Sequence, residues 1–219
     1  FNAERKDWDY RQDQLNSTHS IATDMVDIET VKANFDGITY AKGASVLQQL
    51  VAHVGRENFI SGLQTYFAKH AYKNTTLKDL LSELEKTSGR RLDPWVATWL
   101  QTSGVNTLRP IVKLTGHKYE SVSIKQEPPT IPVGSSDLRP HRMAIALYDL
   151  IDSKFTLRKS IELDVQGEIT EVPAFSGEPF ADLLLINDRD LTFAKIRFDE
   201  KSVESLKQNL GKLTDGLTR

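Results

Sequence analysis

Hydrophobic positions in the first hundred residues recur with the period of an α-helix. The pattern predicts helices over residues 2–15, 28–33, 40–54, 57–70 and 77–88, and a further helix that carries Trp95 and Trp99. The flanking residues fit these limits: Thr76 and Asp79 are spaced as a capping box, and Gly89 stops the helix that they begin. Asp93 followed by Pro94 is typical of a helix N-cap with proline in the first turn.

The helix predicted over residues 40–54 opens with a tyrosine and has a glycine in its first turn. One face carries Tyr40, Ala44, Leu47, Val51 and Val54, and we expect this face to be buried, whereas Lys42, Gln49 and His53 fall elsewhere. Gly43 costs about 1 kcal/mol relative to alanine, so we expect another element or a ligand to approach it closely. Spacing alone makes Tyr40 a core aromatic residue with its hydroxyl bonded to a carbonyl.

After Gly104 the hydrophobic period changes to two, which is typical of strands. The strand-like runs cover residues 111–114, 119–125, 143–151, 155–163, 169–172, 183–186 and 192–198. Residues 187–190 are predicted to form a hairpin turn, and the proline-rich residues 127–140 a loop. Seven short strands with no helix between them indicate an antiparallel β-sandwich, so the predicted fold class is α+β.

These periods divide the chain into three predicted parts. Residues 1–105 form a helical subdomain, residues 106–199 a β-sandwich domain, and residues 200–219 the opening helix of a further, truncated helical domain. That last helix lacks the partners it would pack on, so we expect it to be frayed or loosely docked.

Composition narrows the possible partners. The 219 residues are 39% hydrophobic and 26% charged, with a net charge of −2 spread over both halves. Neither half offers a cationic face, so we expect no nucleic-acid or membrane partner. No run is long enough to span a membrane, and no signal peptide opens the chain, so the expected location is the cytoplasm.

Several motifs, taken in order, resemble one enzyme family. The segment from Phe35 to Ala44 reads F-D-G-I-T-Y-A-K-G-A and is similar to the F-D-x-I-[ST]-Y-x-K-G-A signature of the zinc aminopeptidases of the aminopeptidase N family, which are membrane alanyl aminopeptidase-like gluzincins. Ser17 to Ile21 resembles the preceding S-[ST]-H-P-I, with Ser20 in place of proline. Gly55 to Tyr66 is similar to G-x-x-x-F-x-x-G-L-x-x-Y. The motif resemblance covers residues 13–104.

The resemblance implies the fold and the activity. Residues 1–105 would be the helical C-terminal part of a thermolysin-like peptidase domain, followed by the β-sandwich and the start of a helical domain. The whole protein would be a zinc-dependent aminopeptidase that removes N-terminal residues from peptides. Tyr40 would be its catalytic tyrosine, whose hydroxyl stabilises the oxyanion of the tetrahedral intermediate.

The sequence itself offers no zinc site. A zinc peptidase of this kind needs H-E-x-x-H and a third ligand, but the five histidines are His19, His53, His70, His117 and His141, and no two have that spacing. There is no cysteine either. We therefore expect no metal and no activity in this chain alone, and zinc only in the full-length enzyme. The family carries its ligands upstream of the tyrosine, so the chain resembles a C-terminal fragment, and Phe1 fits an internal start.

Two other functions remain open. The first is a metal-free relative that acts as a protein-interaction scaffold, and the second is a free-standing binding module. Under the main hypothesis the partners are peptide substrates and the rest of the chain's own polypeptide. The substrate-binding residues are unknown.

Other polar residues receive structural roles. We expect His19 to bond backbone groups in a loop, and His53 and His70 to be partly exposed on helices. Asp24, Asp27, Glu29 and Asp36 precede Tyr40 and could attract a substrate ammonium group, although helix capping explains them more simply. Lys42 is expected in a structural ion pair, and Arg139 and Arg142 as surface charges.

Overall fold

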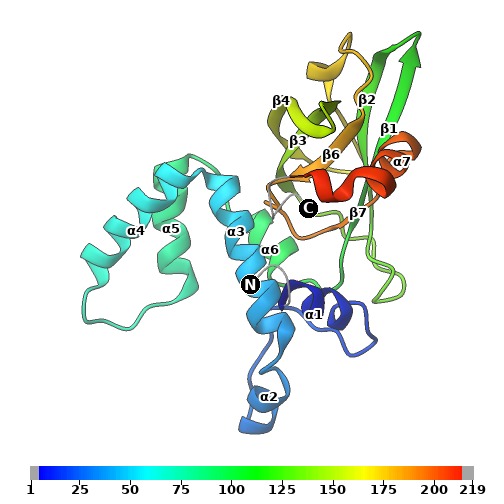
Figure 1. Ribbon diagram of the computed structural model, residues 1–219. Coiled ribbons are helices and arrows are strands. Elements are labelled where there is room, and N and C mark those ends of the chain that lie inside the picture. Colours follow the sequence, from blue (N-terminus) through cyan, green and yellow to red (C-terminus); the bar gives the residue numbers. More distant parts are fainter. Residues whose placement is uncertain (1–4, 214–219) are drawn as a thin grey trace.

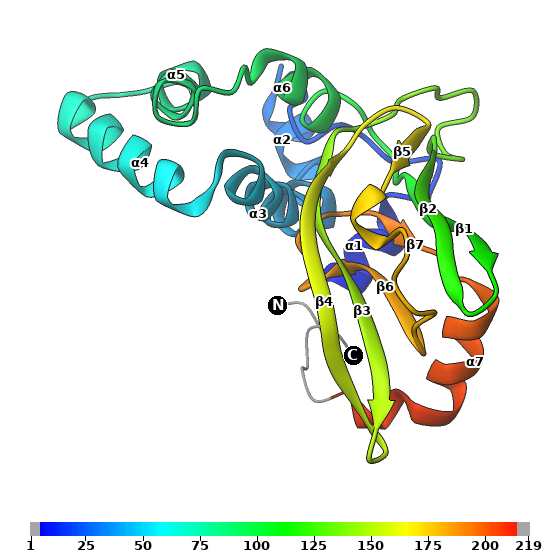
Figure 2. The same ribbon diagram turned by 90° about the horizontal axis from the view of Figure 1, so that it is seen from above.

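Helices and sheets occupy separate halves of the chain, as the α+β prediction requires. The computed structural model describes residues 5–213, in which α1 to α6 precede the strands and α7 follows them (Figure 1). The helices are α1 (Arg5–Gln12), α2 (Ile28–Ala33), α3 (Gly43–Val54), α4 (Arg56–His70), α5 (Leu77–Ser88), α6 (Asp93–Trp99) and α7 (Glu200–Asn209). Helices α4 and α5 lie side by side, farthest from the sheets, with α3 between them and the sheets (Figures 1 and 2).

Strands form within every run that the period of two predicted. They are β1 (Thr107–Thr115), β2 (Lys118–Glu127), β3 (His141–Ile151), β4 (Lys154–Val165), β5 (Ile169–Glu171), β6 (Leu183–Asp188) and β7 (Lys195–Ile196). One sheet has the order β5-β2-β1-β7 and the other the order β4-β3-β6. The two sheets share a core, with Val122 and Ile124 from one and Ile145 and Leu147 from the other. The alternating side chains therefore predicted the sandwich correctly.

The last predicted strand is wrong in length and direction. Only Lys195 and Ile196 pair with β1, and they do so in parallel rather than antiparallel. The preceding residues leave the sheet because Phe193 packs among the helices, where its ring stacks on Tyr10 at 4.4 Å. Residues 187–190 do turn the chain, but they connect two different sheets and so close no hairpin.

The buried face of α3 differs from the predicted one. Leu47 is 55% exposed and Tyr40 is 49% exposed, whereas Val46 and Leu50 are buried. Gln49 is also buried, because its amide exchanges two hydrogen bonds of 2.8 Å with the backbone of Arg142 on β3. A hydrophobic pattern cannot reveal a polar side chain that is satisfied by a distant strand.

The caps of α5 and α6 show how local sequence fixes the helix limits. Thr76 and Asp79 form the predicted capping box, and Gly89 ends α5 with φ +67°. The prediction for α6 is wrong by one position, since Leu92 is its N-cap and Asp93 is its first residue. As predicted, Trp95 and Trp99 pack in the core between the helices.

Arg139 holds the junction between the helices and the sheets, which corrects its predicted place on the surface. The residue is 1% exposed, and its guanidinium donates to the carbonyl oxygens of Thr98 and Ser103 and to the side chains of Thr102 and Asn106. These hydrogen bonds offset the desolvation cost of burying the guanidinium charge, because every one of the partners is an oxygen acceptor. Arg142, by contrast, is half-buried near the carboxylates of Glu162 and Asp164 on β4.

Helix α7 is docked rather than frayed. The Ser202 hydroxyl accepts a hydrogen bond of 2.9 Å from the Leu184 amide, so the helix is attached to β6. Leu206 and Leu213 pack with Phe155 and Leu183 in a small core of their own. Residues 1–4 of the predicted first helix, and residues 214–219 of the predicted third part, lie outside the described residues. The three-domain division stays a prediction.

Replacing Arg139 tests the junction. We expect Arg139→Ala to lower the free energy of unfolding by about 3 kcal/mol, because one buried and three partly buried acceptors lose their donor. Urea unfolding followed by circular dichroism measures this change. The control is Arg109→Ala, which removes an exposed ion pair with Glu127 and should cost about 1 kcal/mol or less. Equal losses in the two variants would contradict the assigned role of Arg139.

Candidate active site

Tyr40 lies on a π-helical turn, Ile38–Lys42, that leads directly into α3. We call these five residues the Tyr40 turn. The turn starts where Asp36 accepts hydrogen bonds from the Thr39 and Tyr40 amides through its side chain and its carbonyl. It ends where the Gly43 amide donates to the carbonyl of Ile38, five residues earlier. The predicted regular helix is thus interrupted, and π-turns of this kind often occur at functional sites.

The Tyr40 side chain projects from the protein instead of entering the core. It is 49% exposed, and its ring meets the Phe35 ring edge-to-face at 4.8 Å between centroids. Within residues 5–213 its hydroxyl has no hydrogen-bond partner. The spacing-based prediction of a core tyrosine bonded to a carbonyl is therefore wrong, and the hydroxyl is available to donate to a group outside the described residues.

An apolar groove of about 470 Å³ runs beside Tyr40. Its walls are Ile21, Ala22, Thr39, Tyr40, Gly43, Ala44, Val46, Leu47, Leu50, Leu77, Leu80, Leu81, Trp95 and Leu100. Three residues of the face that the sequence predicted to be buried, Tyr40, Ala44 and Leu47, therefore line an open groove, whereas Val54 of the same face is buried as predicted. A Cβ added to Gly43 would meet only the carbonyl oxygen of Ile38, at 3.9 Å, so no described residue makes the expected close approach.

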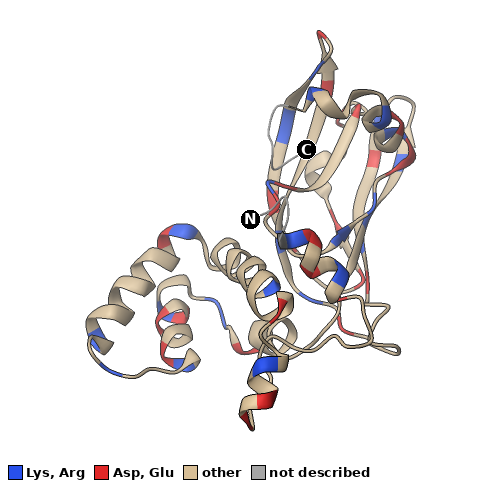
Figure 3. Cartoon of the chain, turned by 60° about the horizontal axis from the view of Figure 1, so that its bottom comes forward, with Lys and Arg blue, Asp and Glu red and all other residues tan. Residues whose placement is uncertain are grey.

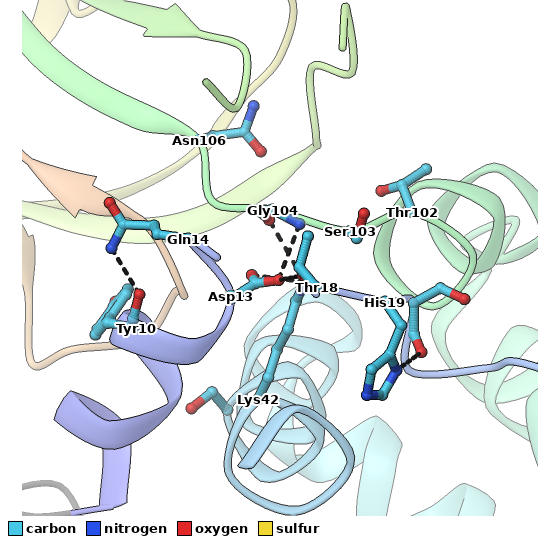
Figure 4. A network of polar contacts seen from close by, with 12 residues as sticks. Tyr10, Asp13, Gln14, Thr18, His19, Lys42, Thr102, Ser103, Gly104 and Asn106 are labelled. Atoms are coloured by element: carbon cyan, nitrogen blue, oxygen red, sulfur yellow. Dashed lines mark hydrogen bonds and ion pairs between the residues drawn. The ribbon is translucent and has the colours of Figure 1, made fainter. Parts of the chain in front are cut away.

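Lys42 is buried, unlike Tyr40, and extends into a network of polar contacts (Figure 4). Its ammonium lies 2.8 Å from a carboxylate oxygen of Asp13, and both side chains are completely buried. The other carboxylate oxygen of Asp13 accepts from the Thr18 hydroxyl at 2.6 Å and from the Gly104 amide at 2.9 Å. The predicted structural ion pair of Lys42 is confirmed, with Asp13 as a partner that the sequence did not reveal.

His19 and Asp36 hold the loop beneath the Tyr40 turn. His19 contacts the Ser20 carbonyl at 2.8 Å and the Asp36 carboxylate at 2.9 Å through its two ring nitrogens. The first contact is the predicted backbone bond. The Asp36 carboxylate also accepts a hydrogen bond from the side-chain amide of Gln12, so neighbouring protein groups already engage it.

Capping accounts for two of the acidic residues that precede Tyr40, Asp27 and Asp36. Asp27 caps α2 by accepting from the Thr30 amide at 2.7 Å, and its hydrogen bonds with Thr30 lower its pKa. Asp24 and Glu29 are exposed. These positions give no reason to assign a binding site for a substrate ammonium group.

The histidines at the helix ends are structural. His53 is buried, contrary to its predicted partial exposure, and its Nδ1 lies 3.3 Å from Arg90. Burial lowers its pKa, and the nearby Arg90 charge lowers it further. His141, which the sequence did not single out, is 1% exposed between Thr192 and Gln126, and burial lowers its pKa to about 3. His70 is half-buried, with its ring 5.3 Å from that of Tyr66.

The residues present do not fit a zinc ion. Across residues 5–213 no three acidic or histidine side chains are grouped closely enough to hold a metal. Each histidine discussed above is engaged by neighbouring protein groups. We therefore derive no chemical step through a metal from this chain.

Comparison with known proteins identifies the family. Residues 2–99 match the peptidase family M1 domain. The whole chain aligns with aminopeptidase N of Streptomyces lividans, with 50% identity over 224 residues that make up 26% of that protein. The chain belongs to the M1 peptidase family. The recognised signature around Tyr40 lies within the matched M1 region.

More distant M1 relatives carry related names. A leucyl aminopeptidase of Saccharolobus solfataricus is 33% identical over 130 residues, which cover 55% of this chain and 16% of that protein. The Tricorn protease-interacting factor F2 of Thermoplasma acidophilum is 26% identical over 207 residues, covering 94% of this chain and 23% of that protein. The chain thus spans about a quarter or less of the length of these relatives.

A buried carboxyl beside the Asp13 and Lys42 pair provides a pH test. Asp9 is completely buried, and neither of its carboxyl oxygens has a hydrogen-bond partner within residues 5–213. Burial raises its pKa from 3.8 to about 8, and the Asp13 charge adds to the shift, while Lys42 and Lys6 oppose it. Because the folded state holds this proton more tightly than the unfolded state, stability falls as the pH rises from about 4 to about 8.

Asp9→Asn removes this titration. We expect the variant to gain stability over the unmodified chain as the pH rises, by up to about 1.4 kcal/mol per pH unit, with the largest gain at pH 8. Urea unfolding at pH 5 and pH 8 measures the gain, and Asp7→Asn at an exposed position of the same helix is the control. A gain that is equal at both pH values would contradict the assignment.

Proposed function

We propose that this chain is part of a zinc-dependent aminopeptidase that hydrolyses N-terminal residues from peptides, with Tyr40 as its oxyanion-stabilising residue. The observation that carries the proposal is the free, exposed hydroxyl of Tyr40 beside an open groove. M1 membership and the aminopeptidase names of its relatives support the reaction class.

The phenol hydroxyl suits this task chemically. Attack of water on a peptide carbonyl places negative charge on the carbonyl oxygen, and this charge develops fully only in the tetrahedral intermediate. A donor aimed at that oxygen lowers the barrier without binding the substrate more tightly. Since no described residue occupies the Tyr40 hydroxyl, no internal hydrogen bond has to break before it donates.

We place the zinc ligands and the general base in residues outside this chain. Zinc, when bound there, would polarise the carbonyl and activate the attacking water. This chain alone would be inactive, and its partners would be peptide substrates and the rest of its own polypeptide. Exposed apolar side chains around Tyr40, including Phe35 and Leu47, support a polypeptide partner on this face.

Charge and helix length bear on other partners. Within residues 5–213 no helix is both long and apolar enough to cross a membrane. Lys and Arg residues are scattered among Asp and Glu residues over the described part of the chain in Figure 3, which shows no cationic stretch that would attract nucleic acid. The cytoplasmic location stays a proposal, and cell fractionation tests it.

A scaffold without metal is the second candidate. It is favoured by one relative whose name describes interaction with the Tricorn protease. Hydrolysis of an aminoacyl-anilide by the complete polypeptide separates the candidates. Activity that a chelator abolishes and zinc restores supports the peptidase, and no activity supports the scaffold.

Tyr40→Phe in the complete polypeptide tests the catalytic role. We expect kcat to fall about 100- to 1,000-fold while KM changes little, because the lost hydrogen bond forms only as the oxyanion develops. Steady-state kinetics on an aminoacyl-anilide give both values.

The matched control is Tyr72→Phe, which removes the same hydroxyl from a fully exposed side chain on another loop. It should leave kcat unchanged. An unchanged kcat in Tyr40→Phe itself would remove Tyr40 from the mechanism.

A further inference from the structure

Tyr40 and Lys42 leave the same short turn on opposite sides. They belong to the five residues of the Tyr40 turn, yet Tyr40 is half exposed and Lys42 is completely buried. Side chains two positions apart on a helical turn leave it on roughly opposite sides, because two residues make up about half a turn. Whatever fixes Lys42 therefore also fixes the direction in which Tyr40 projects.

The Lys42 ammonium is fixed by contacts from two other segments. It pairs with Asp13, just beyond α1, at 2.8 Å and lies 3.4 Å from the carbonyl oxygen of Gly104, just before β1. The Gly104 amide donates to Asp13 at 2.9 Å, so the pair contacts both the backbone amide and the backbone carbonyl of Gly104 (Figure 4). The Phe193 ring lies 5.7 Å from the ammonium and closes the site.

Gly104 is itself held against the β-sandwich. Its φ of +81° and the crowding by Pro129 and Ile131 exclude a Cβ, since one added there would collide with the Ile131 carbonyl. The neighbouring Ser103 carbonyl accepts from the buried Arg139 at 3.0 Å. The anchor of Lys42 is consequently tied both to the loop between β2 and β3 and, through Ser103, to Arg139.

Stability alone does not require a charged pair at this place. A buried ion pair loses hydration energy on folding, and neutral side chains of similar shape often serve equally well. Burial lowers the pKa of Lys42, and the Asp13 charge opposes that shift. The charged pair instead contributes geometric specificity. The ammonium and the carboxylate must contact each other and Gly104 at the same time, and this restricts the orientation of the Lys42 side chain.

We propose that Asp13 and Lys42 are positioning residues for Tyr40. They hold the Tyr40 turn in a fixed position relative to Gly104, and this fixes the position and orientation of the tyrosine hydroxyl. The proposal rests on the catalytic role of Tyr40 proposed above. A misplacement of about 1 Å at a catalytic group can cost about 100-fold in rate. Asp13 and Lys42 touch no substrate and act only through Tyr40.

The test uses the complete polypeptide and measures kcat, KM and the melting temperature. We expect Lys42→Met to lower kcat about 10- to 100-fold with KM changed less than about 3-fold, and to lower the melting temperature. The control is Lys6→Met, which breaks another buried lysine pair, with Asp190 at 2.6 Å, at a residue of α1 that is not part of the Tyr40 turn. It should also lower the melting temperature, yet leave kcat unchanged.

A double variant separates position from stability. Asp13→Asn combined with Lys42→Met removes both charges of the pair, so neither is left buried without the other and the melting temperature should recover relative to Lys42→Met. The proposal expects kcat to remain low in this variant. A kcat that recovers together with the melting temperature would overturn it, because the pair would then serve stability only.

A cycle with Tyr40→Phe separates this proposal from the proposed function. If Lys42 acts through Tyr40, Lys42→Met should lower kcat in the native background and change it less than about 2-fold in the Tyr40→Phe background. Equal losses in both backgrounds would overturn the positioning role while leaving Tyr40 catalytic. No loss of kcat from Tyr40→Phe alone would overturn the proposed function and this proposal together.

Discussion

The buried ion pair between Asp13 and Lys42 is the contact on which the arrangement of the helices and the sheets depends. It joins the end of α1, the Tyr40 turn and the segment that enters β1, three segments that are far apart in the sequence. Arg139 secures the same segment from the sandwich side. Two buried cations and one buried carboxylate thus lie at this junction, together with the hydrophobic contacts that Val105 and Phe193 make with the helices.

This polar junction explains why an apolar groove is left open on the other side. Lys42 and Gln49 take the buried positions of the Tyr40 turn and α3 that a hydrophobic pattern would give to Tyr40 and Leu47. Those two side chains then face outward, along the groove. The face that looks most like core in the sequence is in this way available to a substrate or to another part of the polypeptide.

Much of the fold can be predicted from local sequence, because side-chain alternation and helix caps depend only on residues a few positions apart. The alternation of side chains placed the first six strands and only two residues of the seventh, and the Thr76 capping box and Gly89 fixed both ends of α5. The errors share a physical cause. Arg139, Gln49 and Phe193 are each placed by partners more than 30 residues away, which no local pattern contains. Tyr40 itself was found through the family signature and not through its spacing.

The central claim is that Tyr40 binds the transition state and not the ground state. A peptide phosphinate mimics the tetrahedral intermediate, whereas a free amino acid product does not. The most direct measurement compares the Kd of each ligand for the complete polypeptide with and without Tyr40→Phe. The account predicts about 100-fold weaker binding of the phosphinate and less than about 3-fold change for the amino acid. Equal changes for both ligands, or no change for either, would contradict it.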